Sequence, residues 1–514
     1  MKKRVWTLIL IPLLLFYALP VGAVEKEDRK WQDESIYFLM VDRFNNGDFH
    51  NDFHVDVKDP EAFHGGDFQG IMNKLDYIKD MGFTTIWLTP IFDNEDNGYH
   101  GNWINDFYNT EEHFGTMEEF KALVQEAHKR DMKVILDFVV SHVGLNHPWL
   151  NEPDKKDWFN DQEEMIHSED QQDLKAGWMN GLPKLNQENP EVKNYLIDAA
   201  KWWIEETNID GYYLDAIDSV PKSFTTEFAK EVKKTKDQFY LLGDVRSNDP
   251  AIISGYQDTG IDGFINYPLT EKLRPAFDQV DKSLKDLFTV EDQNSSIYSN
   301  PYLMGTLMDN NHIIRFTHDA ITKNQHPGPR WKLALTYLYT TPGIPIVYYG
   351  SEIALDGGEG SDNYRQMDFR TDKDLIEHIT KIGELRNTLP SLTRGTMELL
   401  VVDNGLAVYK RTLENETTVI AINNTSESQS VTINAAQLEA DKELRGLLNG
   451  DLVRSTDDGQ YTIFIDREEA EVYVLAEKTG LNLSFISAMV IVYGTFIIFI
   501  ILLRKRSKRN KPQE

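Results

Sequence analysis

Four short segments, each at the end of an apolar run, carry carboxylate and imidazole side chains that could act on one bond. They are DFVVSH (137–142), GYYLDAID (211–218), YLLGDV (240–245) and RFTHDA (315–320). Their candidate groups are three carboxylates and two imidazoles: Asp215, Asp244, Asp319, His142 and His318. One carboxylate can attack an anomeric carbon while another protonates the leaving oxygen, so these residue types suit hydrolysis of a sugar linkage.

Eight strand-like runs alternate with amphipathic segments and would position these groups. The predicted strands are 35–44, 84–90, 133–139, 211–217, 239–245, 264–269, 313–319 and 344–350. Strands that alternate with helices pair in parallel through right-handed crossovers, so eight units predict a (β/α)8 TIM barrel within residues 24–390. Active sites of such barrels lie at the C-terminal ends of the strands. The four segments end predicted strands three, four, five and seven.

Two further folded parts are predicted. The polar stretch 143–181 is too long for an ordinary connection after strand three, and it predicts a small inserted subdomain. After about Pro390 the pattern changes to short alternating strands with turn signals, which predicts a C-terminal antiparallel β-sandwich at 391–478. Its expected strands are 406–411, 417–423, 430–433, 461–465 and 470–475.

The two ends of the chain predict export and a membrane anchor. Residues 1–23 have the basic, apolar and small-residue order of a secretory signal peptide. Residues 483–503 carry no charge and, at about 1.5 Å per residue, would cover about 30 Å as a transmembrane helix. The basic tail 504–514 would then be cytoplasmic, with the folded part outside the cell. The alternative for 483–503 is a buried core helix.

Composition limits the remaining possibilities. The chain has 514 residues, 41% hydrophobic and 26% charged, which suits one large domain plus a smaller one. Its net charge of −30 repels polyphosphate, so nucleic acid is not an expected partner. It contains no cysteine, so it has neither disulfides nor a zinc–thiolate site.

The chain resembles α-amylase-type members of glycoside hydrolase family 13 from about Glu34 to Leu475. The landmarks are DRFNNGD (42–48), GYHGNW (98–103), the four segments above and GIPIVYYGSE (343–352). The adjacent Trp202 and Trp203, with LPKL at 182–185, resemble a bacterial subgroup that has a paired tryptophan and an LPDL-like motif. These tryptophans would pack between barrel and insert, or one would be a sugar platform. The resemblance implies retaining hydrolysis of α-1,4 bonds in starch-like α-glucans.

The resemblance also assigns roles. Asp215 would be the nucleophile, Asp244 the acid/base, and Asp319 the group that stabilises the oxocarbenium-like transition state. The expected sugar-binding residues are His100, His142, His318, Tyr213, Asn102 and Arg365. Taken singly, such an aspartate is more often a helix cap and such a histidine a structural residue; their joint spacing favours the site.

Several positions depart from the family pattern. Asp244 stands where the family has Glu, and a misplacement of about an ångström can cost on the order of 10²-fold in rate. Tyr213 stands where the family has Arg, so the pKa of Asp215 is expected to rise. Asn102 replaces a stacking aromatic residue, while Ser141 and Thr317 replace asparagines. We therefore expect weak or altered hydrolysis. The alternative is a catalytically inactive member that binds α-glucan or has a structural role at the cell surface.

Calcium is the expected cofactor at one place and not at another. The family's shared interdomain site is predicted to be lost, because its ligand positions hold Ser141, Lys184 and Ser219. The asparagine- and aspartate-rich loop near the N-terminus resembles a second calcium loop of related amylases and glucanotransferases. Its expected ligands are Asn46, Asp48, Asn51, Asp52, the Gly65 carbonyl and Asp67. Six oxygens suit calcium, and the alternative is a solvated turn.

Overall fold

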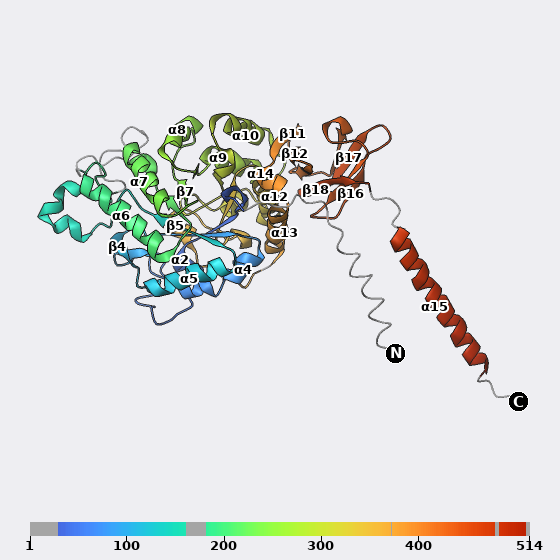
Figure 1. Cartoon of the computed structure of the whole chain (residues 1–514), viewed down its shortest axis with the longest axis horizontal. Coiled ribbons are helices and arrows are strands. Elements are labelled where there is room, and N and C mark those ends of the chain that lie inside the picture. The colour runs from blue at the N-terminus through green and yellow to red at the C-terminus, as the bar shows by residue number, and fades with distance from the viewer. Residues whose placement is uncertain (1–28, 161–180, 372, 479–482, 510–514) are drawn as a thin grey trace.

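The computed structural model of the chain describes residues 29–160, 181–371, 373–478 and 483–509. Its large N-terminal part is built around parallel strands with helices outside them, and a smaller sheet domain follows (Figure 1). The predicted signal peptide, 1–23, lies outside the described residues, as does most of the second half of the predicted insert.

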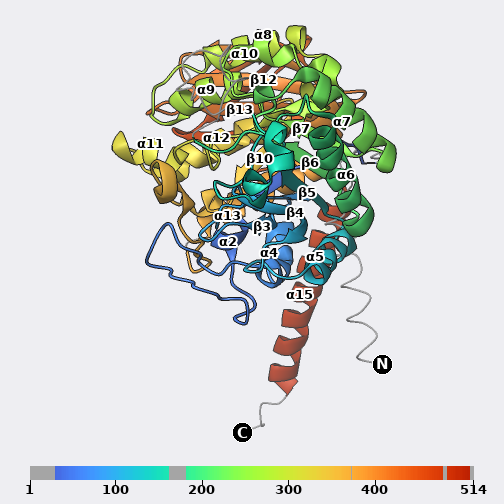
Figure 2. The ribbon, with the colours of Figure 1, turned by 90° about the vertical axis from the view of Figure 1, so that its left-hand side faces the viewer.

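Eight parallel strands form the barrel predicted from the sequence. They are β1 (Ile36–Leu39), β2 (Thr85–Leu88), β5 (Lys133–Phe138), β6 (Gly211–Leu214), β7 (Tyr240–Gly243), β8 (Gly263–Phe264), β9 (Gly305–Thr306) and β10 (Ile344–Tyr348). Their order is β8-β7-β6-β5-β2-β1-β10-β9, and a parallel bridge from Ile265 to Gly305 joins the two outer strands. Figure 2 shows the strands at the centre of a ring of helices.

The helices cover the barrel because their apolar residues lie on one face. Helix α5 (Met117–Lys129) starts at Thr116 with a capping box and buries Phe120, Leu123, Val124 and Ala127, which follow helical spacing. The other helices are α2 (Val41–Phe44), α3 (Phe68–Met72), α4 (Leu75–Asp80), α6 (Pro190–Thr207), α7 (Lys222–Thr235), α8 (Pro250–Ser254), α9 (Tyr267–Phe277), α10 (Lys285–Ile297), α11 (Phe316–Thr322), α12 (Pro327–Thr340), α13 (Asp374–Thr388) and α14 (Pro390–Arg394).

The prediction for the seventh strand was wrong. Residues 316–322 form helix α11, with Phe316, Thr317 and Ala320 buried at helical spacing. The seventh parallel strand is instead the two-residue β9, which pairs with β10 through Gly305 and Ile344. The apolar run 313–316 resembled a strand, whereas β9 is too short for an alternating pattern to reveal it.

Strands β3 (Phe92–Asn94) and β4 (Ile104–Thr110) form a short antiparallel hairpin. The segment after β5 lies beside this hairpin, outside the barrel. Trp203 on α6 is fully buried and donates its indole N–H to the Phe107 carbonyl at 2.6 Å. Trp202 is half-buried, with its ring 5.2 Å from that of Tyr108. Both tryptophans therefore pack against the β4 hairpin.

The C-terminal domain is antiparallel, as predicted. One sheet has the order β11-β12-β13-β18-β15-β16, and β14 pairs with β17 in a second sheet. The strands are β11 (Thr396–Asp403), β12 (Leu406–Leu413), β13 (Glu416–Asn423), β14 (Gln429–Asn434), β15 (Lys442–Gly446), β16 (Leu452–Arg454), β17 (Gln460–Ile465) and β18 (Glu469–Glu477). Arg411 on β12 donates to the Thr340 carbonyl of α12 at 2.6 Å, which ties this domain to the barrel.

The last helix is α15 (Leu483–Arg509). Within the part of the chain that the structure describes, no helix combines the length and apolar character that a membrane crossing requires. This finding contradicts the predicted cell-membrane location, with its single span at 483–503, outer folded part and cytoplasmic tail at 504–514.

Candidate active site

The parallel register of β5, β6 and β7 brings the predicted carboxylates together. Leu214 is paired with Gly243, so Asp215 and Asp244, the next residues, leave neighbouring strands at the same end of the barrel. Asp137 lies on β5 opposite Tyr213 of β6. All three carboxylates are buried. The barrel therefore gathers acidic side chains at the C-terminal ends of its strands, where active sites of this fold lie.

One arginine bridges two of these carboxylates. Arg246 donates from Nη2 to Asp215 Oδ1 at 2.5 Å and from Nε to Asp244 Oδ2 at 2.8 Å. His312, which follows β9, places its Nε2 3.1 Å from Arg246 Nη2 and 3.8 Å from Asp215 Oδ1. A single guanidinium thus holds the carboxylates of β6 and β7 close together, with an imidazole beside them.

Asp244 has no oxygen facing solvent. Its side chain is 0% exposed, and its Oδ1 accepts a hydrogen bond from the Tyr267 hydroxyl at 2.7 Å. Its Oδ2 accepts the bond from Arg246. Both oxygens of this carboxyl therefore have a hydrogen-bond donor within the site.

The charges of the cluster shift the pKa values of Asp215 and Asp137 in opposite directions. Burial alone would raise the pKa of Asp215, but the Arg246 guanidinium and then His312 outweigh it and hold that pKa below its usual value. The predicted rise in the pKa of Asp215 was therefore wrong, because the guanidinium of Arg246, three residues after β7, contacts this carboxyl. Burial, with Asp215 and Asp244 nearby, raises the pKa of Asp137 well above its usual range.

Two predicted histidines line the same region in their neutral form. Burial lowers the pKa of His142, whose Nδ1 lies 2.8 Å from Ser141 Oγ. Its Nε2 is buried without a hydrogen-bond partner among the described residues. Burial also lowers the pKa of His100 to about 4, and its Nδ1 accepts the backbone N–H of Asn102 at 3.0 Å.

Tyr213 and Asn102 differ in their surroundings. Tyr213 is buried, with its ring 4.2 Å from that of Trp87. It therefore packs in the barrel interior. Asn102 is half-buried, and its backbone N–H donates to His100 Nδ1.

The other predicted residues form a separate group on and beside α11. Asp319 accepts a short bond from Arg274 of α9, and His318 Nδ1 lies 3.0 Å from Asp356 Oδ1. Arg365 pairs with Asp362 at 2.7 Å. No contact recorded within the described residues links this group to Asp215 or Asp244. The side chain that lies beside Asp215 from the segment after β9 is that of His312.

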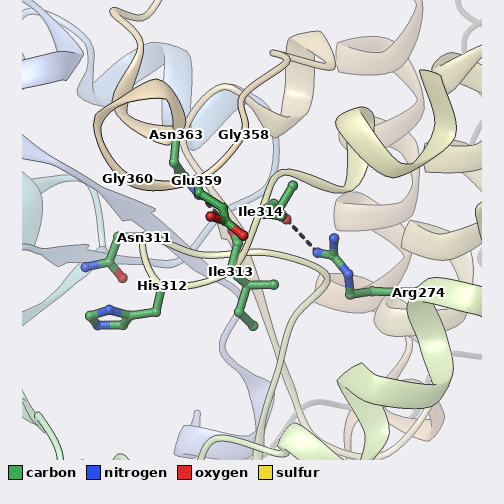
Figure 3. A pocket seen from close by; sticks show the side chains of 9 residues that line it. All are labelled: Arg274, Asn311, His312, Ile313, Ile314, Gly358, Glu359, Gly360 and Asn363. Atoms are coloured by element: carbon green, nitrogen blue, oxygen red, sulfur yellow. Dashed lines mark hydrogen bonds between the residues drawn. The ribbon is translucent and has the colours of Figure 1, made fainter. Parts of the chain in front are cut away.

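A pocket of about 390 Å³ is lined by Arg274, which contacts Asp319, and by His312, which contacts Arg246. Figure 3 shows Arg274 on one side and Asn311 and His312 on the other, with Glu359 between them. His312 belongs both to this pocket and to the Arg246 contact, so the pocket adjoins the cluster.

Sequence reasoning missed Arg246, His312 and Tyr267. Arg246 lies two residues after Asp244, in the same segment, and a search for a cation to replace the missing arginine would have found it. His312 ends MDNNH (308–312), which follows β9; the misplaced seventh strand concealed it. Tyr267 begins α9 and had no distinguishing signal.

The asparagine-rich loop brings part of the predicted calcium set together. Asn46 Nδ2 donates to Asp52 Oδ1 at 2.9 Å, and a Cβ on Gly65 would lie 2.7 Å from that same oxygen. Asn46 Oδ1 and Asn51 Oδ1 are buried without a partner in the described structure. By contrast, both oxygens of Asp67 accept backbone N–H groups, and Asp48 Oδ1 accepts from His50.

Within the described structure, the loop does not bring enough carboxylates together to form an acidic cluster around Asn46, Asn51 and Asp52. Among the described residues, no group of three or more His, Cys, Asp or Glu side chains could hold a metal. Of the predicted ligands, Asn46 and Asn51 keep a side-chain oxygen that is unpartnered in the part of the chain that the structure describes, whereas Asp52 accepts from Asn46, and Asp48 and Asp67 accept from other groups.

A TIM barrel with buried carboxylates at its strand ends and a C-terminal antiparallel domain defines a class of glycoside-cleaving enzymes. Residues 38–446 match the alpha-amylase catalytic domain, so the chain belongs to the alpha-amylase family. An alpha-amylase structure from Anoxybacillus is 61% identical, covers 88% of this chain and 100% of its own, and has a TM-score of 0.87. That of Geobacillus thermoleovorans, complexed with acarbose, is 57% identical, with coverages of 88% and 100% and a TM-score of 0.85.

Curated relatives extend these findings. A beta/alpha-amylase of Paenibacillus polymyxa is 34% identical over 86% of this chain, and the match spans 38% of that relative. The chain thus covers less than half of that protein's length. An intracellular maltogenic amylase of Bacillus subtilis is 30% identical over 81% of this chain and 72% of its own. This relative's location also differs from the export predicted for this chain.

Proposed function

We propose that the protein hydrolyses α-1,4 bonds of starch-like α-glucans weakly, by a retaining double displacement. Asp215 would attack the anomeric carbon, and Asp244 would act as the acid/base. The observation that carries this proposal is the bridge through Arg246, because one guanidinium contacts both carboxylates. Retaining enzymes use carboxyls about 5 Å apart, and a shared guanidinium keeps the pair near that separation.

Neutral imidazoles and related proteins support α-glucan as the ligand. Burial lowers the pKa values of His142 and His100, and neutral imidazoles can exchange hydrogen bonds with sugar hydroxyls. The related alpha-amylase structure from Geobacillus thermoleovorans was determined in complex with acarbose. Asp319, His318 and Arg365 would contact sugar units farther from the cleaved bond, because Arg274, which contacts Asp319, lines the pocket opposite His312.

Weak turnover follows from the state of Asp244. A general acid must carry a proton and reach the leaving oxygen, whereas this carboxyl is fully buried and accepts bonds at both oxygens. It is also one methylene shorter than glutamate, which moves its oxygens away by about an ångström and can cost on the order of 10²-fold in rate.

A second candidate is α-glucan binding without turnover. It is favoured by the contact between Arg246 Nη2 and Asp215 Oδ1, because that oxygen would have to approach the anomeric carbon. Binding would then use the outer positions of the cleft, with the carboxylates neutralised by arginine.

Calcium is the cofactor that we infer for the N-terminal loop. Asn46, Asn51, Asp52 and the Gly65 carbonyl would hold it, and it would stabilise the loop that leads into α3. We infer that the calcium site shared between domains in this family is lost here. Lys184, at one of its ligand positions, is 1% exposed and forms an isolated antiparallel β-bridge with His142.

The hydrolase proposal is tested with the full-length chain and its Asp215→Asn variant on soluble starch and on an activated maltoside. We expect slow release of reducing sugar by the wild type and none above background by the variant. Equal background rates exclude hydrolysis. Binding of maltoheptaose by both proteins, measured by calorimetry, would then support the second candidate.

A further inference from the structure

The Arg246 guanidinium lies where a substrate has to be. Nη2 is 2.5 Å from Asp215 Oδ1, and Nε is 2.8 Å from Asp244 Oδ2. In retaining hydrolysis, the anomeric carbon must approach the first carboxylate while the glycosidic oxygen approaches the second. A sugar in that position and the observed guanidinium would overlap, since both need the space between the same two carboxylates.

The arginine is also the most exposed member of this contact. Its side chain is 35% exposed, compared with 8% for Asp215 and 0% for Asp244. It therefore covers the carboxylates from the solvent side. A long, partly exposed side chain can change rotamer without moving the barrel, whereas the side chains of Asp215 and Asp244 are enclosed by their neighbours.

We propose that Arg246 is an internal gate of the cleavage position, a resident cation that a ligand must displace before it reaches Asp215 and Asp244. This inference rests on the proposed α-glucan site. The ligand that this gate opposes most strongly is a sugar analogue with a positive charge at the ring, such as an iminosugar. Such a ligand seeks the same two carboxylates and is repelled by the guanidinium, because like charges held together are costly. A neutral glucan can still occupy the outer positions.

The test is calorimetric titration of the full-length protein with 1-deoxynojirimycin and, separately, with maltoheptaose. Arg246→Ala and the milder Arg246→Gln remove the charge, while Arg246→Lys keeps it. Arg130→Ala is the matched control, since Arg130 pairs with Asp76 and Glu126 at the far end of α5. We expect the two uncharged variants to bind the iminosugar at least about tenfold more tightly than the wild type. Lysine and control variants should stay within about twofold.

Unchanged or weaker iminosugar binding by both folded, uncharged variants would overturn the gate. If only one of the two uncharged variants keeps the wild-type circular dichroism spectrum, the iminosugar affinity of that variant alone tests the gate. The maltoheptaose titration separates this inference from the proposed function. Iminosugar binding that strengthens while maltoheptaose binds to no variant would keep the gate and reject the glucan site. Maltoheptaose binding without tighter iminosugar binding would reject the gate and keep the glucan site.

Discussion

At the scale of single residues, the position of one positive charge governs the chemistry of the cluster. Three buried carboxyls at adjacent strand ends would repel one another if all were ionised. Arg246 offsets this repulsion and lowers the pKa of Asp215, whereas Asp137, with its Oδ1 unpartnered, has a raised pKa. The arrangement favours an ionised nucleophile. The same guanidinium occupies Asp244 Oδ2, so a leaving oxygen cannot reach that atom while Arg246 stays in place.

The double variant Arg246→Ala/Asp244→Glu should therefore hydrolyse an activated maltoside faster than the wild type, by on the order of 10²-fold in kcat/KM. The first change frees the cleavage position, and the second returns the missing methylene to the acid. Asp244→Glu alone should instead lose about 1–3 kcal/mol of stability, because the longer side chain enters a fully buried site with Arg246 still in place.

Release of the chromophore measures the rates. Adding Asp215→Asn to the double variant is the control, and it should return the rate to background. A double variant no faster than the wild type would show that restoring the acid and opening the gate are not sufficient for turnover.

At the scale of elements, the sequence predicted the strands that follow a regular alternation with helices and missed the exceptions. β6 and β7 are buried apolar runs with an aspartate directly after them, so their site residues could be located by pattern. β9 has only two residues, so no periodicity marks it, and the apolar run before α11 replaced it in the prediction. The contact of Arg246 with Asp215 depends on strand register, which pattern alone does not give.

The loop between α2 and α3 should gain stability from calcium. At a concentration about 100 times the dissociation constant, ligand binding adds about 2.7 kcal/mol to the free energy of unfolding. We expect a rise in Tm of a few degrees on adding Ca²⁺ to chelator-treated protein, and no rise in Asp52→Asn. Asp59→Asn, an exposed aspartate of the same loop, is the matched control and should keep the response. An equal response of the two variants would place any calcium elsewhere.

At the scale of the whole molecule, buried arginines join the barrel to the C-terminal domain. Arg330 of α12 bonds Glu468 at 2.8 Å, and Arg411 of β12 bonds the carbonyls of Thr340 and Gly395. The antiparallel domain was predictable because its strands alternate clearly. These interdomain contacts were not, because a buried arginine and a surface arginine look alike in sequence.

Glu291 of α10 should make the stability of this junction depend on pH. Its side chain is buried, and its Oε1 accepts the Tyr337 hydroxyl at 3.4 Å. Burial raises its pKa to about 7, with Arg411 of the C-terminal domain opposing the rise. A raised folded-state pKa means that the folded protein binds the proton more tightly than the unfolded chain. The resulting stability is complete below about pH 4.5 and is lost as pH rises through 7.

Glu291→Gln cannot ionise, so its advantage over the wild type should grow from near zero at pH 5 to about 3 kcal/mol at pH 8.5. Thermal melting of both proteins across this range measures the difference. Glu205→Gln, an exposed position on α6, should follow the wild type at every pH. A constant difference between Glu291→Gln and the wild type would show that the carboxyl keeps one ionisation state throughout, and that the junction between barrel and C-terminal domain does not titrate near neutral pH.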